Sequence, residues 1–255
     1  MIRLILIFIF LILFFLTGLI TNIYIMILRK KDKYRATDIS NRIVGNSFSL
    51  ILFLAGTKKI VKGLENIPES SALYVGNHRS YFDIVITHSS LKKAGKSKTY
   101  RVPLGFIAKI EIDKVPFLRT WMRNIGCLFL DRKDTRAALK SILTGVDILK
   151  EGHQSLVIYP EGTRGHKDTM APFKKGSFKL AEKSGVPIVP VAIIGSDDVF
   201  ENNPWILKVR PRKVYLTFGE PIDTASLDKE TLKHIDSYVQ KKIADLIEKT
   251  KEEIA

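Results

Sequence analysis

A long apolar run opens the chain, from Ile2 to Leu28, and Arg3 is the only charged residue within it. At about 1.5 Å per residue, a helix of this length exceeds the roughly 30 Å hydrocarbon core of a bilayer. A cleaved signal peptide fits less well, because the apolar region is too long and no small-x-small cleavage site follows it. We therefore expect an N-terminal helix embedded in a membrane.

Positive charges follow directly after this run. Lys and Arg beside a membrane segment tend to remain on the cytoplasmic side, where anionic head groups attract them. The sequence therefore predicts localisation at the cell membrane, with the rest of the chain on the cytoplasmic face. The residues concerned are Arg29, Lys30, Lys31, Lys33 and Arg35.

The stretch from Ile39 to Ala55 mixes apolar residues with Asn, Arg and Ser, a pattern typical of an amphipathic helix. Two arrangements are consistent with the sequence: a spanning helix followed by an interfacial one, or a helical hairpin that enters a single leaflet. We favour the hairpin, because Thr17 and Gly18 interrupt the first run and the second helix offers it an apolar face. Residues 1–57 are thus predicted to be the membrane-anchoring helices.

Residues 58–255 have a different pattern, in which short apolar runs alternate with amphipathic stretches. This alternation predicts an α/β domain with a largely parallel or mixed sheet flanked by helices, and ligands of such sheets collect beyond the carboxyl ends of the strands. The expected strands are 59–62, 72–75, 101–108, 127–130, 155–159, 188–193 and 213–218. The expected helices are 81–91, 117–124, 135–151, 175–184 and 228–253.

Charge and missing motifs limit the function. The net charge of +15 favours an acidic partner such as anionic lipid, a phosphorylated substrate or an acidic carrier protein. Nucleic acid is not expected, because no recognition motif is present and the apolar helix would hold the protein away from it. The usual motifs of serine hydrolases, nucleotide hydrolases, dinucleotide enzymes and zinc proteases are absent. The single cysteine, Cys127, excludes a disulfide framework, and we expect neither a metal nor a cofactor.

A histidine and an aspartate follow the strand predicted over 72–75. On a continuous helix His78 and Asp83 would lie about 140° apart, so they meet only if the backbone curls between them. Gly76 breaks the strand, and the helix expected from Tyr81 holds Asp83 in its first turn. The carboxylate would then fix the imidazole tautomer and leave the other nitrogen to accept a proton, as a general base does. The alternative is a histidine that an aspartate satisfies in an ordinary loop.

A second motif, Tyr159-Pro-Glu-Gly-Thr-Arg-Gly165, ends the strand predicted over 155–159. Glycine lets the backbone approach a ligand closely, and Thr163 and Arg164 add an amide, a hydroxyl and a guanidinium that can bind two oxygens at once. This combination suits a phosphate group. The alternative is a turn with a solvated arginine.

Four ordered motifs resemble those of the glycerolipid acyltransferases, and most of all those of the 1-acyl-glycerol-3-phosphate acyltransferases, which make phosphatidic acid. They cover about half of the chain, 72–194. Tyr159 stands where the family often has Phe, and Gly165 where it often has Ser. The motifs are Asn77-His78 with Asp83, Gly126-Cys-Leu-Phe-Leu-Asp131-Arg132, Tyr159-Pro-Glu-Gly-Thr-Arg164 and Val186-Pro-Ile-Val-Pro-Val-Ala192.

The resemblance implies acyl transfer from acyl-CoA or acyl carrier protein to the 2-hydroxyl of lysophosphatidic acid. His78, oriented by Asp83, would remove the hydroxyl proton, and no covalent acyl-enzyme would form. Basic clusters at 92–101 and 208–213 fit either anionic membrane lipids or an acidic carrier protein. Two alternatives remain open: acylation of another acceptor, such as glycerol-3-phosphate or another lysolipid, and a membrane lipid-binding protein without catalysis.

The same resemblance implies where the acceptor binds. Its phosphate would lie on a guanidinium and on two backbone amides of the 159–165 motif, with further basic side chains adding charge. Glu161 is a poor phosphate ligand and would brace the loop or a hydroxyl. The other residues of this binding site are Lys109, Arg132, Gly162, Thr163 and Arg164.

Overall fold

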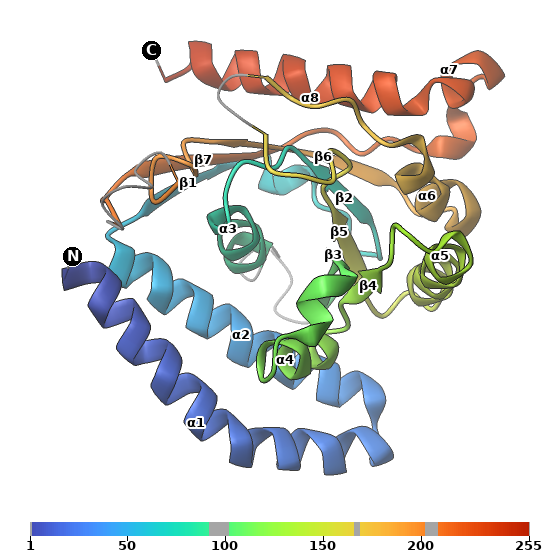
Figure 1. Ribbon diagram of the computed structural model, residues 1–255. Helices are drawn as coiled ribbons and strands as arrows, with labels where there is room; N and C mark the ends of the chain where they lie inside the picture. Colours follow the sequence, from blue (N-terminus) through green and yellow to red (C-terminus); the bar gives the residue numbers. More distant parts are fainter. Residues whose placement is uncertain (1, 92–101, 166–168, 202–208, 255) are drawn as a thin grey trace.

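A seven-stranded mixed sheet forms the centre of the protein, in the order β1-β7-β6-β2-β5-β3-β4. Figure 1 shows the computed structural model, which describes residues 2–91, 102–165, 169–201 and 209–254. The basic cluster at 92–101, the start of the strand expected from Arg101, and Lys208 lie outside the described residues. The strands are β1 (Lys58–Lys62), β2 (Leu73–Gly76), β3 (Leu104–Lys109), β4 (Leu128–Leu130), β5 (Ser155–Ile158), β6 (Ile188–Ile194) and β7 (Lys213–Phe218).

Strand direction divides the sheet into two parts. β6, β2, β5, β3 and β4 run parallel, whereas β7 is antiparallel to β6 and β1 is parallel to β7. The predicted α/β class with a largely parallel or mixed sheet is therefore confirmed. One consequence for the site is that β1 begins at the edge where β2 and β5 end.

Helices cover both faces of the sheet, as Figure 1 shows. Successive residues of β2 face opposite sides, so that Tyr74 packs toward α1 to α4, whereas Leu73 and Val75 pack toward α5, α6 and α8. The helices are α1 (Ile2–Lys31), α2 (Lys33–Ala55), α3 (Phe82–Leu91), α4 (Leu118–Asn124), α5 (Thr135–Lys150), α6 (Lys179–Ser184), α7 (Lys229–Lys233) and α8 (Ile235–Glu252). Short 3-10 turns are η1 (Leu64–Asn66), η2 (Ile110–Lys114), η3 (Lys175–Phe178) and η4 (Thr224–Ser226).

Within the α/β domain, three expected elements differ from the sequence prediction by more than a shift of a few residues at an end, or in the role of a residue. Gly76 is the last residue of β2 rather than its break, because it still pairs with Val191 of β6. The helix expected over 175–184 starts as the 3-10 turn η3. The helix expected over 228–253 is divided into α7 and α8 at His234, whose φ of −117° and ψ of 32° are not helical.

The two N-terminal helices form a hairpin. Asp32 makes the turn and caps α2, because its side chain accepts a hydrogen bond from the amide of Arg35 at 2.9 Å. α2 therefore begins at Lys33, earlier than its amphipathic pattern predicted. At the open end of the hairpin, Arg3 Nη1 donates to the carbonyl oxygen of Leu54 at 3.1 Å.

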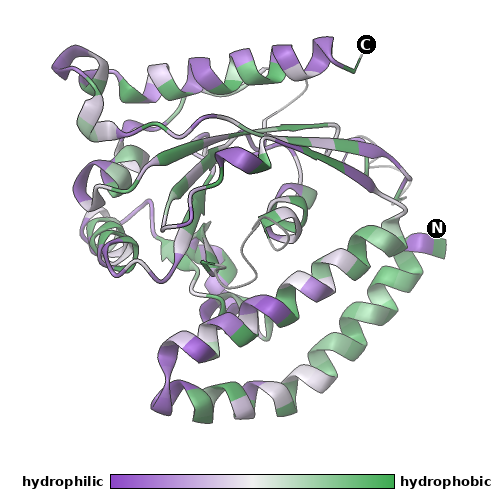
Figure 2. Cartoon of the chain, turned by 180° about the vertical axis from the view of Figure 1, so that it is seen from behind, coloured by the Kyte–Doolittle hydropathy of each residue, from purple (hydrophilic) through white to green (hydrophobic). Residues whose placement is uncertain are grey.

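One side of α1 faces the protein and the other is exposed. Gly18 lies against Trp121 of α4, so closely that a Cβ atom there would be 3.0 Å from the indole nitrogen. Figure 2 shows that α1 is hydrophobic along most of its length. By length and composition, α1 could cross a membrane. Its exposed side includes Ile5, Phe8, Ile12, Leu16, Leu19, Ile20, Ile23 and Ile27.

Candidate active site

The parallel strands bring the predicted site residues to one edge of the sheet. His78 follows β2, the second motif follows β5, and Lys109 ends β3. Lys109 is exposed and pairs with Leu130, the last residue of β4, so that Arg132 follows two residues later. Parallel strands that end together form the usual ligand-binding edge of an α/β sheet.

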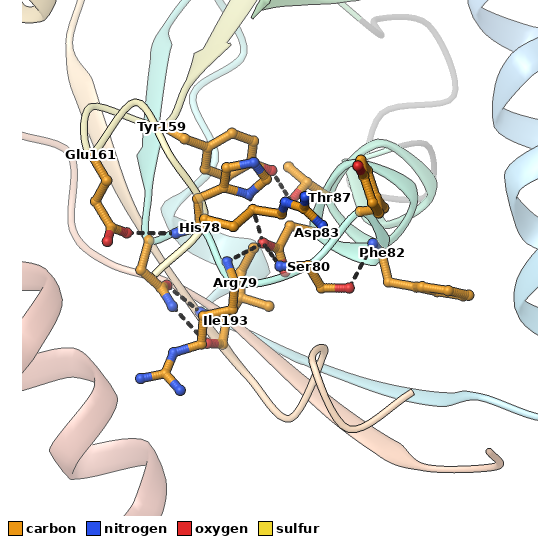
Figure 3. A network of polar contacts seen from close by, with 12 residues as sticks. His78, Arg79, Ser80, Phe82, Asp83, Thr87, Tyr159, Glu161 and Ile193 are labelled. Carbon is orange, nitrogen blue, oxygen red and sulfur yellow. Dashed lines mark hydrogen bonds and ion pairs between the residues drawn. The ribbon is translucent and has the colours of Figure 1, made fainter. Parts of the chain in front are cut away.

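His78 and Asp83 meet as the sequence predicted. Nδ1 of His78 lies 2.8 Å from Oδ2 of Asp83, which is fully buried in the first turn of α3. The same oxygen accepts the backbone amides of Arg79 at 2.6 Å and Ser80 at 2.8 Å. Figure 3 shows this convergence of donors. Because Nδ1 faces the carboxylate, Nε2 is the nitrogen that remains to accept a proton.

An aromatic ring fixes one face of the imidazole. The ring of Tyr159 stacks on His78 with a centroid separation of 4.5 Å and an interplanar angle of 15°. The Tyr159 hydroxyl lies 3.3 Å from the hydroxyl of Thr87 in α3. Burial, and then the charge of Asp83, raise the pKa of Tyr159, so this hydroxyl stays protonated. The stack and the carboxylate together leave the imidazole little freedom to turn.

Hydrogen bonds to the 159–165 motif hold the backbone of His78. Glu161 is buried, and its carboxylate accepts the amide of His78 at 2.7 Å and the amide of Ala171 at 2.9 Å. The carbonyl oxygen of His78 accepts the amide of Gly165 at 2.7 Å. Burial raises the pKa of Glu161, while these hydrogen bonds act in the opposite direction. Glu161 therefore ties the loop to the backbone of His78.

A side-chain amide holds the end of β2 to β6. Asn77 is fully buried. Its Nδ2 donates to the carbonyl oxygen of Ile193 at 2.9 Å, and its Oδ1 accepts the amide of Ile193 at 2.8 Å. This pair of bonds replaces the ladder that the sheet would otherwise continue, so the chain can turn away and present His78.

Two arginines at this loop, Arg132 and Arg164, already contact other groups of the protein. Gly162 has a φ of 74°, a conformation that favours glycine, and its carbonyl oxygen accepts Nη1 of Arg132 at 2.5 Å. The guanidinium of Arg164 lies 3.9 Å from the ring centroid of Tyr81, and its Nη1 is 3.7 Å from Glu201. Thr163 and Arg164 are exposed at this edge, so a ligand can reach them.

The model of a protein family, described as Acyltransferase, matches residues 58–194 of this chain. The chain belongs to the acyltransferase family. Its resemblance to the glycerolipid acyltransferases, inferred above from four motifs, is thus confirmed.

Individual relatives agree with this family. The acyltransferase is 33% identical over 201 residues to a probable 1-acyl-sn-glycerol-3-phosphate acyltransferase of Mycoplasma pneumoniae, covering 77% of this chain and 73% of that protein. It is 31% identical over 201 residues to a 1-acyl-sn-glycerol-3-phosphate acyltransferase of Borreliella burgdorferi, covering 78% and 76%. The crystal structure of the LPA acyltransferase PlsC of Thermotoga maritima has the same fold, with a TM-score of 0.77, 24% identity, and coverage of 98% and 95%.

Several residues of the candidate site could not be found from sequence. Glu201 accepts the amide of Tyr81 at 2.8 Å and the hydroxyl of Ser80 at 2.7 Å, besides its contact with Arg164. It lies about 120 residues from Ser80 and Tyr81 and outside every motif. Lys174 lies close to Gly162, where a Cβ atom would be 3.1 Å from its Nζ. Among the described residues, no group of three His, Cys, Asp or Glu could hold a metal ion.

Proposed function

We propose that this acyltransferase transfers an acyl group from an acyl thioester to the 2-hydroxyl of 1-acyl-glycerol-3-phosphate, giving phosphatidic acid. The observation that carries the proposal is the partly exposed His78, 2.8 Å from the buried carboxylate of Asp83, beside a basic loop at the carboxyl edge of the sheet. The printed names of the relatives from Mycoplasma and Borreliella support the same reaction.

The reaction needs one proton to move twice. Nε2 of His78 accepts the proton of the acceptor hydroxyl while that oxygen attacks the thioester carbonyl. The new carbon–oxygen bond forms, the carbon–sulfur bond breaks, and the leaving thiolate takes the proton back from the imidazolium. The carboxylate of Asp83 stabilises the imidazolium that exists between the two transfers. No acyl-enzyme is required, and the atoms balance without a metal or a cofactor.

The acceptor's phosphate would lie at the loop after β5. Arg164 can bind two phosphate oxygens, and the amide of Thr163 can add a donor, whereas the amide of Gly162, which was also expected to bind phosphate, donates to the carbonyl oxygen of Tyr159 at 3.0 Å. Arg132 holds the carbonyl oxygen of Gly162 and places a positive charge beside it. Lys109 adds a second charge from the neighbouring strand end. Binding energy at the phosphate then orients the hydroxyl toward His78.

The α1–α2 hairpin would anchor the enzyme in one leaflet of the cell membrane, with the domain of 58–255 on the cytoplasmic face. α1 packs one side on α2 and α4 and exposes an apolar side along its length. Such a helix can lie within the surface of a bilayer with its apolar side among the acyl chains. Anionic lipids would attract the basic turn of the hairpin. The acyl donor would be acyl-CoA or acyl carrier protein.

An acceptor panel tests the proposal. The purified enzyme in mixed micelles is supplied with labelled acyl-CoA or acyl carrier protein and with 1-acyl-glycerol-3-phosphate, glycerol-3-phosphate or lysophosphatidylcholine. We expect phosphatidic acid from the first acceptor and little product from the others. A stronger signal from another acceptor would contradict the substrate assignment.

A matched pair of histidine variants tests the catalytic role. His78→Ala should lower kcat by about 10² to 10⁴, the usual contribution of a general base, without changing acceptor binding. His234→Ala, on the exposed break between α7 and α8, should leave kcat unchanged. If His78→Ala kept more than about a tenth of wild-type kcat, a non-catalytic lipid-binding function or another base would explain the site better.

A further inference from the structure

An exposed apolar turn precedes α4. It comprises Val115 to Leu118, and we call it the 115–118 turn. Its side chains are exposed, by 46% for Val115, 51% for Phe117 and 37% for Leu118. The turn lies between η2 and α4 and is not part of the site described above. Large apolar groups gathered on one turn mark a contact surface more often than isolated ones do.

The backbone of this turn is strained. Phe117 has a φ of 61° and is the one residue other than glycine with a positive φ in the described ranges. The amide of Leu118 donates to the carbonyl oxygen of Pro116 at 2.6 Å, which makes a tight three-residue turn around Phe117. Such a conformation costs about 1 to 3 kcal/mol for a residue with a side chain. Core burial does not offset this, because half of the Phe117 side chain is exposed.

The turn is continuous with the exposed side of α1. The ring of Phe117 lies 6.2 Å from that of Phe15, and Phe14 lies 4.8 Å from Trp121, one turn further along α4. Leu19, one helical turn beyond Phe15 on α1, is exposed. Figure 1 shows α4 beside the hairpin, in agreement with these contacts. The two surfaces therefore form one apolar face.

Charges beside the turn favour a lipid surface. Lys114 precedes the turn and Arg119 follows it, and both side chains are exposed. Basic side chains on either side of an inserted apolar group can extend to phosphate head groups while their stems lie in the interface. The turn by itself offers far less than the about 800 Å² that a stable protein interface needs from each partner, so self-association would have to use the side of α1 that the proposed attachment places in the bilayer.

We propose that the 115–118 turn inserts into the same bilayer leaflet as α1 and is a second membrane contact of the enzyme. This inference rests on the proposed attachment of the hairpin. The exposed apolar side of α1 already decides which side of the hairpin meets the bilayer, but the narrow helix resists rocking of the domain about its long axis only weakly. A second insertion beside α1 would widen the contact, resist this rocking and hold the sheet in one orientation relative to the membrane.

Depth-dependent quenching tests the insertion. Single cysteines are placed at Phe117, at Phe8 on α1 and at Leu139 on α5, each in a Cys127→Ala background, and labelled with an environment-sensitive fluorophore. Phe8 and Leu139 are both exposed in the structure. The proteins are added to vesicles of phosphatidylcholine and phosphatidylglycerol that contain spin-labelled lipid. We expect a blue shift and quenching at positions 117 and 8, and neither at 139.

The outcomes separate the two proposals. If label 8 were not quenched, the attachment of the hairpin would fail. If label 8 were quenched and label 117 remained in water, the attachment would stand and insertion of the turn would be wrong. A spectral change at 117 that depends on protein concentration and needs no lipid would indicate self-association and would also overturn the inference.

A glycine variant separates insertion from folding. Phe117→Gly suits the positive φ, so the thermal midpoint should not fall. Vesicle partitioning should nevertheless weaken by about tenfold or more, since a buried phenyl ring stabilises association with an apolar phase. Leu139→Gly, or Leu139→Ser if the glycine disturbs α5, is the control and should partition like the wild type. Unchanged partitioning of Phe117→Gly would overturn the inference.

Discussion

Replacement of Asp83 by Asn separates the charge of this side chain from its hydrogen bonds. One oxygen, Oδ2, accepts the ring nitrogen of His78 and the amides of Arg79 and Ser80. An amide oxygen in that place can accept the same three donors. Asp83→Asn therefore keeps the position and tautomer of the imidazole and removes the negative charge beside it.

The size of the effect follows from the geometry. Charges on the imidazolium and the carboxylate lie about 4 Å apart, and at an effective dielectric constant near 20 their attraction is about 4 kcal/mol. The imidazolium exists only while the hydroxyl proton is held, so this energy acts on the transition state. Part of it remains as a dipole in the amide. We expect kcat to fall by about 10² to 10³, with little change in the KM of either substrate.

Replacement of Asp83 by Asn or by Ala should lower the thermal stability of the protein to different extents. Oδ1 of Asp83 is buried without a hydrogen-bond partner among the described residues, so the new NH₂ group of Asn would be unsatisfied there. This costs about 1 to 3 kcal/mol, or a few degrees in Tm. Asp83→Ala should lower Tm further, because it also leaves the amides of Arg79 and Ser80 unpaired.

The assay is steady-state kinetics with both substrates varied, together with thermal unfolding of the same preparations. Asp147→Asn, an exposed position on α5, makes the same chemical change elsewhere and should match the wild type in both measurements. A kcat for Asp83→Asn within about threefold of wild type would show that the charge is not used. The mechanism through an imidazolium at His78 would then be wrong.

Three further predictions concern the loop and the core. Arg164→Ala should raise the KM for the acceptor about tenfold or more and leave the KM for the donor unchanged. Glu201→Gln removes the negative charge beside Arg164 and should lower the KM for the acceptor modestly. If either variant changed the KM of both substrates equally, the residue would have a structural role. Glu161→Gln should lower kcat, because one backbone amide then faces an NH₂ group. Because folding raises the pKa of Glu161 above its ordinary value of 4.5, the wild type loses stability relative to Glu161→Gln as pH rises through that range. The Tm difference between wild type and Glu161→Gln should therefore be larger below about pH 4 than at pH 7. Burial raises the pKa of Cys127 to about 12, so mass spectrometry should detect no alkylation of the folded enzyme at pH 8 and rapid alkylation after unfolding.

The sequence was sufficient for the parts of the site that depend on local rules. Within about ten residues the chain forms a strand, a loop and the first turn of a helix, and each of these has a recognisable sequence pattern. This succession of elements is what brings His78 to Asp83. The parallel arrangement then brings the second motif and Lys109 to the same edge. These inferences need only the directions of neighbouring elements, not the details of side-chain packing.

The remaining features depend on contacts between distant segments. Glu201 and Asn77 each bind a partner more than 100 residues away, and such pairs leave no periodic signal in one sequence. The stack of Tyr159 on His78 depends on the distance between two strand ends. The reversal of β7 depends on how the chain returns after β6, which hydrophobic patterning does not specify. The strained turn at Phe117 is a local backbone state that its residue type disfavours.

The pairing of β1 with β7 has a consequence for how the protein is made. β1 cannot complete its place in the sheet until β7 exists, about 160 residues after the end of α2. At about 5 to 20 residues per second, the ribosome needs roughly 8 to 30 s to produce them. α4 is made earlier, about 70 residues after the end of α2, so Gly18 and Asn22 lack their partners on α4 for roughly 3 to 14 s. Until α4 is made, α1 lacks part of its packing surface, so a bilayer or a chaperone that covers α1 would protect the nascent chain from aggregation.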